Sequence, residues 1–237
     1  MKKRSFIFLF VLCFSAVQLC AQDVAGVFRE VNTAYAKASA MSMQIHYNLF
    51  ANYISTVPYE SSVGEFVKQN NNYYSSLLGI VTIQNNRYKL SISDNDKTII
   101  VSDPHSAEKS PSVPQIDSML AKCSSSELKN ETNGSKNCIL HFEKNPFSEF
   151  DRIEIEINAD HFVSKVVMFY REAVTLDETN PSLKKEKPRL EISYTSISTH
   201  PEFSADQFSE KKYISANGKK IALTPSFATY RLLNYKN

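Results

Sequence analysis

Apolar positions along the chain follow a helical period first and a strand period afterwards. Residues 22–40 have apolar side chains at helical spacing, with polar residues on the rest of the helical wheel. These apolar residues are Val24, Val27, Phe28, Val31 and Tyr35. From residue 43 the period becomes two, which predicts a strand over residues 43–51.

Alternation recurs along most of the remaining chain. The further predicted strand segments are residues 63–78, 80–93, 98–102, 138–142, 153–157, 163–170 and 190–197, and Gln84-Asn85-Asn86 interrupts the second of them. Short turns join the early segments, as in an antiparallel meander. Ile153, Ile155 and Ile157 alternate with polar residues, which is typical of a strand with one buried face. Residues 114–123 are predicted to form a second helix, and residues 124–136 a polar loop.

A large antiparallel sheet with one apolar face has to cover that face, either by curling or with helices. We therefore predict an α+β fold in which a curved antiparallel sheet, a half-barrel, wraps around the N-terminal helix and a short inserted helix. Residues 22–237 form a single domain in this interpretation, with a C-terminal extension from about residue 216.

The first 21 residues have the layout of a secretory signal peptide. Lys2, Lys3 and Arg4 precede an uncharged apolar run over residues 6–17. That run is shorter than the roughly 20 residues of a membrane span. We predict cleavage after Ala21 and export, to the periplasm of a Gram-negative bacterium, of a protein that is not integral to the membrane.

Lipid anchorage through Cys20 is an alternative to simple cleavage. Leu19 precedes this cysteine, where a bacterial lipidation site usually has a small residue. We therefore favour removal of Cys20 with the signal peptide.

The charge of the chain changes once that segment is set aside. The sequence has 27 basic and 25 acidic residues, and three of the basic ones lie in the predicted signal peptide. The remainder is almost neutral and its basic residues are scattered, so no nucleic-acid partner is expected.

Two cysteines follow the predicted cleavage site, Cys123 and Cys138. An even number of cysteines in an exported chain favours a disulfide. The bridge would stabilise the fold by about 3 kcal/mol in the chain-entropy model. The alternative is two buried thiols.

Patterns typical of catalysis, metal binding or cofactor binding are missing from the sequence. The five histidines are not at ligand spacing, and the glycines after the signal are isolated. Glu154 and Glu156 are expected on the polar face of a strand, where their carboxylates would not be buried as acid–base catalysis requires. Asp94 and Asp96 resemble the start of a calcium loop without its later Gly and Glu. We predict no enzyme activity, no metal and no cofactor, with a hydrolase as a weaker alternative.

Aromatic residues gather in and around the first predicted strands. The candidates are Tyr47, Phe50, Tyr53, Tyr73 and Tyr74. They either fill the core or line an apolar groove between sheet and helices that accepts an acyl chain or a hydrophobic peptide.

Several stretches follow the element order of a known family. They are the helix-to-strand switch at residues 27–49, the hairpin at 88–103, the pair 162–170 and 190–197, and the closing Phe203 and Phe208. Together they resemble the LolA-like periplasmic lipoprotein carriers. The resemblance implies the fold and the compartment, and it transfers no binding residue because Trp is absent and the family's gating arginine has no match.

These observations predict a non-enzymatic envelope protein that binds a lipid or lipoprotein acyl chain in a sheet–helix groove. The alternative is a protein-interaction or assembly factor of the envelope with a filled core, whose partner is another envelope protein.

Overall fold

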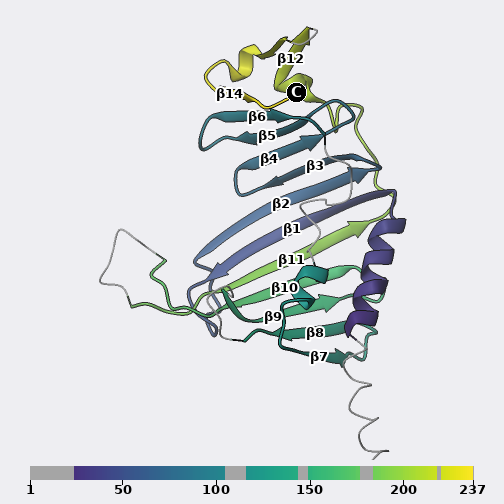
Figure 1. Ribbon diagram of the computed structural model, residues 1–237, viewed down its shortest axis with the longest axis vertical. Helices are drawn as coiled ribbons and strands as arrows, with labels where there is room; N and C mark the ends of the chain where they lie inside the picture. The colour runs from purple at the N-terminus through teal and green to yellow at the C-terminus, as the bar shows by residue number, and fades with distance from the viewer. Residues whose placement is uncertain (1–23, 105–115, 144–148, 177–183, 218–219, 237) are drawn as a thin grey trace, which may run out of the picture. The chain divides into compact units, whose positions relative to one another are not determined.

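The chain folds mainly into β-strands, accompanied by a few helices (Figure 1). The computed structural model describes residues 24–104, 116–143, 149–176, 184–217 and 220–236. The predicted signal peptide, residues 1–21, lies outside the described residues.

Hydrogen bonds join twelve strands into one open sheet in the order β14-β6-β5-β4-β3-β2-β1-β11-β10-β9-β8-β7. The strands of this sheet are β1 (Ala40–Phe50), β2 (Glu60–Gln69), β3 (Asn72–Leu77), β4 (Ile80–Gln84), β5 (Lys89–Ser93), β6 (Thr98–Ser102), β7 (Ser125–Asn130), β8 (Lys136–His141), β9 (Phe150–Ile157), β10 (Val163–Tyr170), β11 (Arg189–Ser198) and β14 (Arg231–Asn234). Neighbours pair antiparallel from β2 to β6 and from β7 to β11. The last strand, β14, runs parallel to β6.

The remaining elements are small. A helix spans residues 24–37, and α2 spans Ile116–Leu120. Two 3-10 turns, η1 (Glu210–Lys212) and η2 (Pro225–Phe227), accompany a separate two-stranded sheet. Its strands are β12 (Ile214–Asn217) and β13 (Lys220–Leu223). The predicted class, a large antiparallel sheet with an N-terminal helix and a short inserted helix, is confirmed.

The chain divides into two compact units. The first unit comprises Met1–Lys37, Asn48–Glu60 and Gln115–Ser193, and the second comprises Ala38–Tyr47, Ser61–Pro114 and Tyr194–Asn237. Each unit has its own set of buried apolar side chains.

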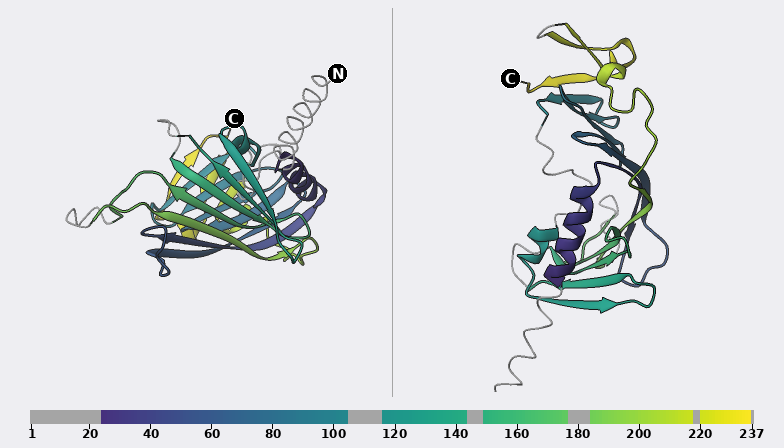
Figure 2. Two further views of the ribbon diagram at one scale, coloured as in Figure 1. Left: turned by 90° about the horizontal axis from the view of Figure 1, so that it is seen from below. Right: turned by 90° about the vertical axis from the view of Figure 1, so that its right-hand side faces the viewer.

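In the first unit the helix and β9 bury the faces that their sequence periods predict. Val24, Val27, Phe28 and Val31 of the helix are buried, and so are Ile153, Ile155 and Ile157 of β9. Ile155 pairs with Val166 of β10 and with Cys138 of β8, so apolar side chains continue from strand to strand. The helix and α2 lie on the same side of these strands (Figure 2).

In the second unit the C-terminal segment supplies part of the core. The buried cluster comprises Ile83, Tyr88, Leu90, Ile92, Ile99, Val101, Tyr213 and Ile214. Phe227 packs on Tyr213 with ring centroids 4.9 Å apart. Residues beyond 203 therefore cover one face of β4, β5 and β6 with apolar side chains.

Two predictions about strands need correction. The predicted polar loop at residues 124–136 contains β7, which pairs with β8 through the backbone at the end of the sheet. Most of its side chains are exposed, so an apolar alternation never develops. The segment 63–78 is a hairpin of β2 and β3, turned at Asn70, whose φ of 53° lies in the left-handed region.

The predicted disulfide between Cys123 and Cys138 is not formed in the structure. The Cys138 side chain on β8 is fully buried. The Cys123 thiol instead donates a hydrogen bond to the Leu120 carbonyl oxygen, 3.2 Å away. Burial raises the pKa of the Cys123 thiol, which disfavours the reactive thiolate.

None of the helices in the described part of the chain is long and apolar enough to cross a membrane.

Candidate functional site

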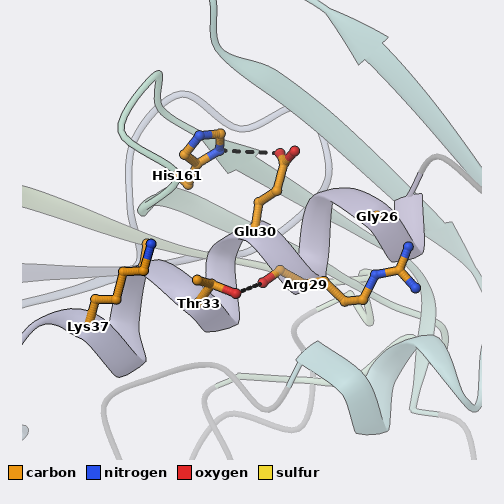
Figure 3. Close-up of a pocket in the computed structure, with 7 residues that line it drawn as sticks. Gly26, Arg29, Glu30, Thr33, Lys37 and His161 are labelled. Carbon is orange, nitrogen blue, oxygen red and sulfur yellow. Dashed lines mark hydrogen bonds and ion pairs between the residues drawn. The ribbon is translucent and has the colours of Figure 1, made fainter.

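A pocket of about 620 Å³ runs along the N-terminal helix of the first unit (Figure 3). The lining residues are Gly26, Arg29, Glu30, Thr33, Ala34, Lys37 and His161. Six of the seven come from the helix, and the seventh comes from the turn between β9 and β10.

Helical spacing explains why these six side chains share one flank. Residues three, four and seven positions apart lie on the same face of an α-helix, and Glu30, Thr33, Ala34 and Lys37 follow that rule. The buried apolar stripe of the helix lies on the opposite side, which leaves this flank open to solvent.

His161 reaches the pocket because the β9–β10 turn is tightly built. The Asn158 side chain accepts hydrogen bonds from the backbone amides of Asp160 and Phe162, at 3.1 and 2.9 Å. His161 itself has a φ of 64°, in the left-handed region that such turns use. Next to it, the Phe162 ring packs edge-on against Tyr35 of the helix, with centroids 5.2 Å apart.

Glu30 links the helix to two parts of the sheet. Its carboxylate lies 2.8 Å from Nζ of Lys136 on β8 and 3.3 Å from Nδ1 of His161. The hydrogen bond from Lys136 lowers the pKa of Glu30, against the opposing effect of desolvation, so the carboxylate is ionised near neutral pH.

The pocket combines small side chains with cationic ends. Gly26 and Ala34 leave space, and a methyl group added at Gly26 would meet only the end of the Arg29 side chain, at 3.8 Å. Arg29 and Lys37 are eight residues apart, which corresponds to about 12 Å along an α-helix. Figure 3 shows them at opposite ends, with Glu30 turned towards His161. Such a surface suits a molecule with an apolar part and an anionic group.

Comparisons with known proteins give structural likenesses only. No protein-family model matches the sequence, and no curated protein matches it either. An uncharacterized conserved protein of Thermus thermophilus is similar over 90% of this chain and 99% of its own, at 9% identity and a TM-score of 0.46. The lipoprotein LppX of Mycobacterium tuberculosis is similar over 75% of this chain and 96% of its own, at 8% identity and a TM-score of 0.40.

A LolA superfamily protein of Nitrosomonas europaea is also among the structural neighbours. The likeness covers 81% of this chain and 98% of that one, at 10% identity and a TM-score of 0.33. The family that the sequence pattern resembles is thus represented. At such TM-scores and identities, these likenesses support no inference about function.

The five predicted groove residues are distributed over both units, and none of them lines the helix pocket. Phe50 and Tyr53 belong to the first unit, whereas Tyr47, Tyr73 and Tyr74 belong to the second. Tyr73 packs near Phe66, with ring centroids 6.4 Å apart, and Tyr74 packs against the buried cluster of the second unit. These two neighbours therefore face opposite sides of β3.

Phe50 and Tyr53 take part in an arginine–aromatic cluster. The Arg189 guanidinium lies 4.2 Å from the centre of the Phe50 ring, and Arg152 lies 3.5 Å from that of Phe169. The Tyr53 ring packs edge-on against Phe169, with centroids 5.1 Å apart. These aromatic rings contact side chains of their own protein.

Tyr53 is anchored through its hydroxyl as well. The hydroxyl donates to the Tyr170 carbonyl and lies 3.1 Å from an Asp151 carboxylate oxygen. Burial, followed by the Asp151 carboxylate, raises the pKa of Tyr53 to about 12. Tyr53 thus fastens the 51–59 loop to β9 and β10.

Sequence reasoning missed the helix pocket. A helical wheel would have shown the flank with Gly26 and Ala34, but nothing in the sequence placed His161 or Lys136 beside Glu30. Within the described residues, no group of three His, Cys, Asp or Glu side chains is placed to hold a metal ion.

Proposed function

We propose that this chain is an exported binding protein of the cell envelope, without catalytic activity, that holds a lipid or lipoprotein acyl chain in the helix pocket, on the flank of the N-terminal helix beside the β9–β10 turn. The helix pocket is the observation that supports the proposal. Its volume of about 620 Å³ lies within the range of roughly 300–1,000 Å³ typical of small-molecule sites. The N-terminal signal pattern supports export.

Shape and charge specify the class of ligand. An aliphatic chain fits against Gly26, Thr33 and Ala34, where no bulky side chain intervenes. A carboxylate or phosphate would be placed near Arg29 or Lys37, because a cationic side chain attracts an anionic group. The Glu30 carboxylate lies in contact with Lys136 and His161, and their proximity weakens its electrostatic repulsion of a bound anion.

Ligand binding can be measured directly on the intact exported chain. Native mass spectrometry after mild purification should show added lipid mass, and a fluorescent fatty acid should bind and be displaced by unlabelled fatty acid. A clean unliganded mass together with no fatty-acid binding would contradict the proposal.

A matched pair of variants locates the site. Ala34→Leu adds bulk inside the pocket, whereas Ala36→Leu adds the same bulk at an exposed position of the same helix that does not line it. Overfilling a site costs about 1–3 kcal/mol, so Ala34→Leu should weaken binding by roughly tenfold or more. Ala36→Leu should bind as the parent does; equal loss in both variants would refute the location.

A protein-interaction or assembly factor of the envelope is the second candidate. It is favoured by the second unit, where Tyr213, Ile214 and Phe227 of the C-terminal segment fill the apolar face of the sheet themselves. This function predicts a stable envelope partner in crosslinked pull-downs and a parent protein that binds no fatty acid.

A further inference from the structure

A second pocket, of about 650 Å³, lies over β5, β6 and β14, which are neighbours in the sheet (Figure 1). All of its lining residues belong to the second unit, and none of them lines the helix pocket. We call it the sheet pocket. Its volume is within the range of roughly 300–1,000 Å³ typical of small-molecule sites, so it is a candidate site for a ligand of its own.

Strand register places the lining side chains on one face of the sheet. Two rows of directly paired residues run across β5, β6 and β14, and they are Ser93, Thr98 and Arg231, followed by Ser91, Ile100 and Leu233. Paired residues point to the same face, and so do residues two positions apart on one strand. The buried cluster of the second unit takes its side chains from the other face of β5 and β6. The sheet pocket therefore lies on the opposite face from that cluster.

The sheet pocket has three charged side chains, and two of them interact with neighbours in the protein. The Lys97 ammonium lies 5.0 Å from the centre of the Tyr230 ring and donates a 3.4 Å hydrogen bond to its hydroxyl. That hydroxyl donates in turn to Asp94, at 2.6 Å. One oxygen of Asp96 accepts a 2.7 Å hydrogen bond from the Ser93 hydroxyl. The charges of Lys97 and Asp96 thus already have partners.

Arg231 is the third charged residue, and its side chain is exposed. Within the described part of the chain, its guanidinium forms neither a hydrogen bond nor an ion pair. The hydroxyls of Ser91 and Thr229 have no hydrogen-bond partner there either. A guanidinium recognises an oxyanion through two parallel N–H bonds. These groups therefore suit a ligand with one anionic group and with hydroxyls of its own.

Asp96 and two aliphatic side chains narrow the class of ligand. Asp96 repels a carboxylate of one charge less than a phosphate of nearly two charges. The second oxygen of Asp96 can accept a hydrogen bond from a ligand hydroxyl. Ile100 is 36% exposed and Leu233 is half-buried, so their aliphatic surface suits the C–H face of a sugar ring. A fatty acid would leave the hydroxyls and Asp96 unused, and a neutral sugar would leave Arg231 unpaired.

We propose that the sheet pocket binds an acidic saccharide, a sugar that bears a carboxylate. The carboxylate pairs with the Arg231 guanidinium. The sugar hydroxyls exchange hydrogen bonds with Ser91, Thr229 and Asp96. The C–H face of the ring packs on the two aliphatic side chains. The proposal is independent of acyl-chain binding in the helix pocket, because the two pockets share no residue.

Isothermal titration calorimetry of the full chain tests the ligand class. Glucuronate and galacturonate have both the carboxylate and the hydroxyls, glucose has the hydroxyls alone, and acetate has the carboxylate alone. We expect at least one of the two uronates to bind about tenfold or more tightly than glucose and acetate, because only a uronate makes the charged pair and the hydroxyl bonds together. Acetate is too short to report on an acyl-chain site.

A matched pair of variants locates the uronate. Arg231→Gln removes the unpaired guanidinium and should weaken uronate binding about tenfold or more, to the level of glucose. Lys220→Gln removes an exposed cation of β13 in the same unit that does not line the sheet pocket, and it should bind as the parent does. Ser91→Leu adds bulk inside the pocket and should weaken binding of glucose and uronate alike. Circular dichroism of each variant verifies that it is folded.

Three results would overturn the proposal. The first is that neither uronate binds more tightly than glucose and acetate. The second is an equal loss of uronate binding in Arg231→Gln and Lys220→Gln, which would mean that only the net charge matters. The third is acetate binding as tight as that of the uronates, which would make the pocket a site for any carboxylate and the saccharide assignment wrong.

Discussion

The carboxylate of Glu30 lies 3.3 Å from Nδ1 of His161, which joins the N-terminal helix to the β9–β10 turn beside the helix pocket. The same carboxylate receives a 2.8 Å contact from Lys136 of β8. One acidic side chain thus links the exposed flank of the helix to β8 and to the β9–β10 turn of the first unit.

Glu30→Gln should lower the free energy of unfolding by about 0.5–1 kcal/mol at pH 7, since exposed ion pairs contribute little individually. The Lys136 hydrogen bond lowers the pKa of Glu30 in the folded state below its ordinary value of 4.5. Its stabilisation is therefore complete above pH 4.5 and is lost as the pH falls through the lowered pKa. Urea unfolding at pH 7 and pH 3 should show a gap between parent and variant that narrows at pH 3.

Glu131→Gln is the control for that comparison, because it removes an exposed carboxylate elsewhere in the first unit. Its unfolding midpoint should stay close to that of the parent at both pH values. A Glu30→Gln gap that widens on acidification would contradict the assigned ion pairs.

Two glycines should respond oppositely to the same substitution. A Cβ at Gly64 would lie 2.0 Å from the Ser76 carbonyl oxygen of the neighbouring strand, so Gly64→Ala must displace backbone. A loss of about 1–3 kcal/mol is expected from such overpacking. Gly26→Ala meets only the end of Arg29 and should stabilise the helix by about 0.5–1 kcal/mol. Thermal melts of both variants provide the test, and equal shifts would refute the difference.

The pattern of apolar and polar residues predicted those helices and strands that bury one face and expose the other. Ile153, Ile155 and Ile157 alternate with polar residues, and all three are buried in β9. The helical spacing from Val24 to Tyr35 likewise matches the helix at residues 24–37. Edge strand β7 lacks this signal, because its backbone pairs on one side while its side chains stay exposed.

Contacts between distant residues were beyond sequence reasoning. The hairpin turn at Asn70 could have been found from the run of three asparagines that follows β2. Nothing local, by contrast, indicates that β14 pairs parallel with β6. The lining of the helix pocket could not be predicted for the same reason, since the position of His161 depends on how β9 and β10 pack against the helix.

Tyr53→Phe should remove one anchor of the 51–59 loop. The phenol bonds to the Tyr170 carbonyl and to Asp151, and its loss should cost about 1–2 kcal/mol at neutral pH. Burial and then Asp151 raise the pKa of Tyr53 to about 12. The folded state thus favours the neutral phenol, and this stabilisation is present below pH 10 and lost as the pH rises towards 12.

The alkaline limb of the stability profile distinguishes Tyr53 from other tyrosines. Between pH 10 and pH 12, Tyr53→Phe should lose less stability than the parent in urea titrations. Tyr235→Phe, at a 64% exposed position, should follow the parent throughout. A steeper alkaline loss in Tyr53→Phe would show that the hydroxyl is not held in its neutral form.

We expect the Glu210 side chain to hold the C-terminal segment in place within the second unit. Its side chain is 7% exposed, forms an ion pair with Arg87 and accepts a 2.8 Å hydrogen bond from Asn85. Glu210→Ala leaves the Asn85 amide without this partner, while Arg87, at 61% exposure, regains water. The balance predicts a loss of about 1–3 kcal/mol, less than for a fully buried pair.

We expect the C-terminal segment of Glu210→Ala to detach before the rest of the protein unfolds, because residues beyond 203 contribute to the core mainly through Tyr213 and Ile214. Limited proteolysis should therefore cut Glu210→Ala within this segment faster than the parent, under conditions where circular dichroism still shows the full strand content. Glu202→Ala, at an exposed acid just before this segment, serves as control and should be cut at the parental rate. Equal cleavage of all three proteins would mean that the apolar contacts alone retain the segment.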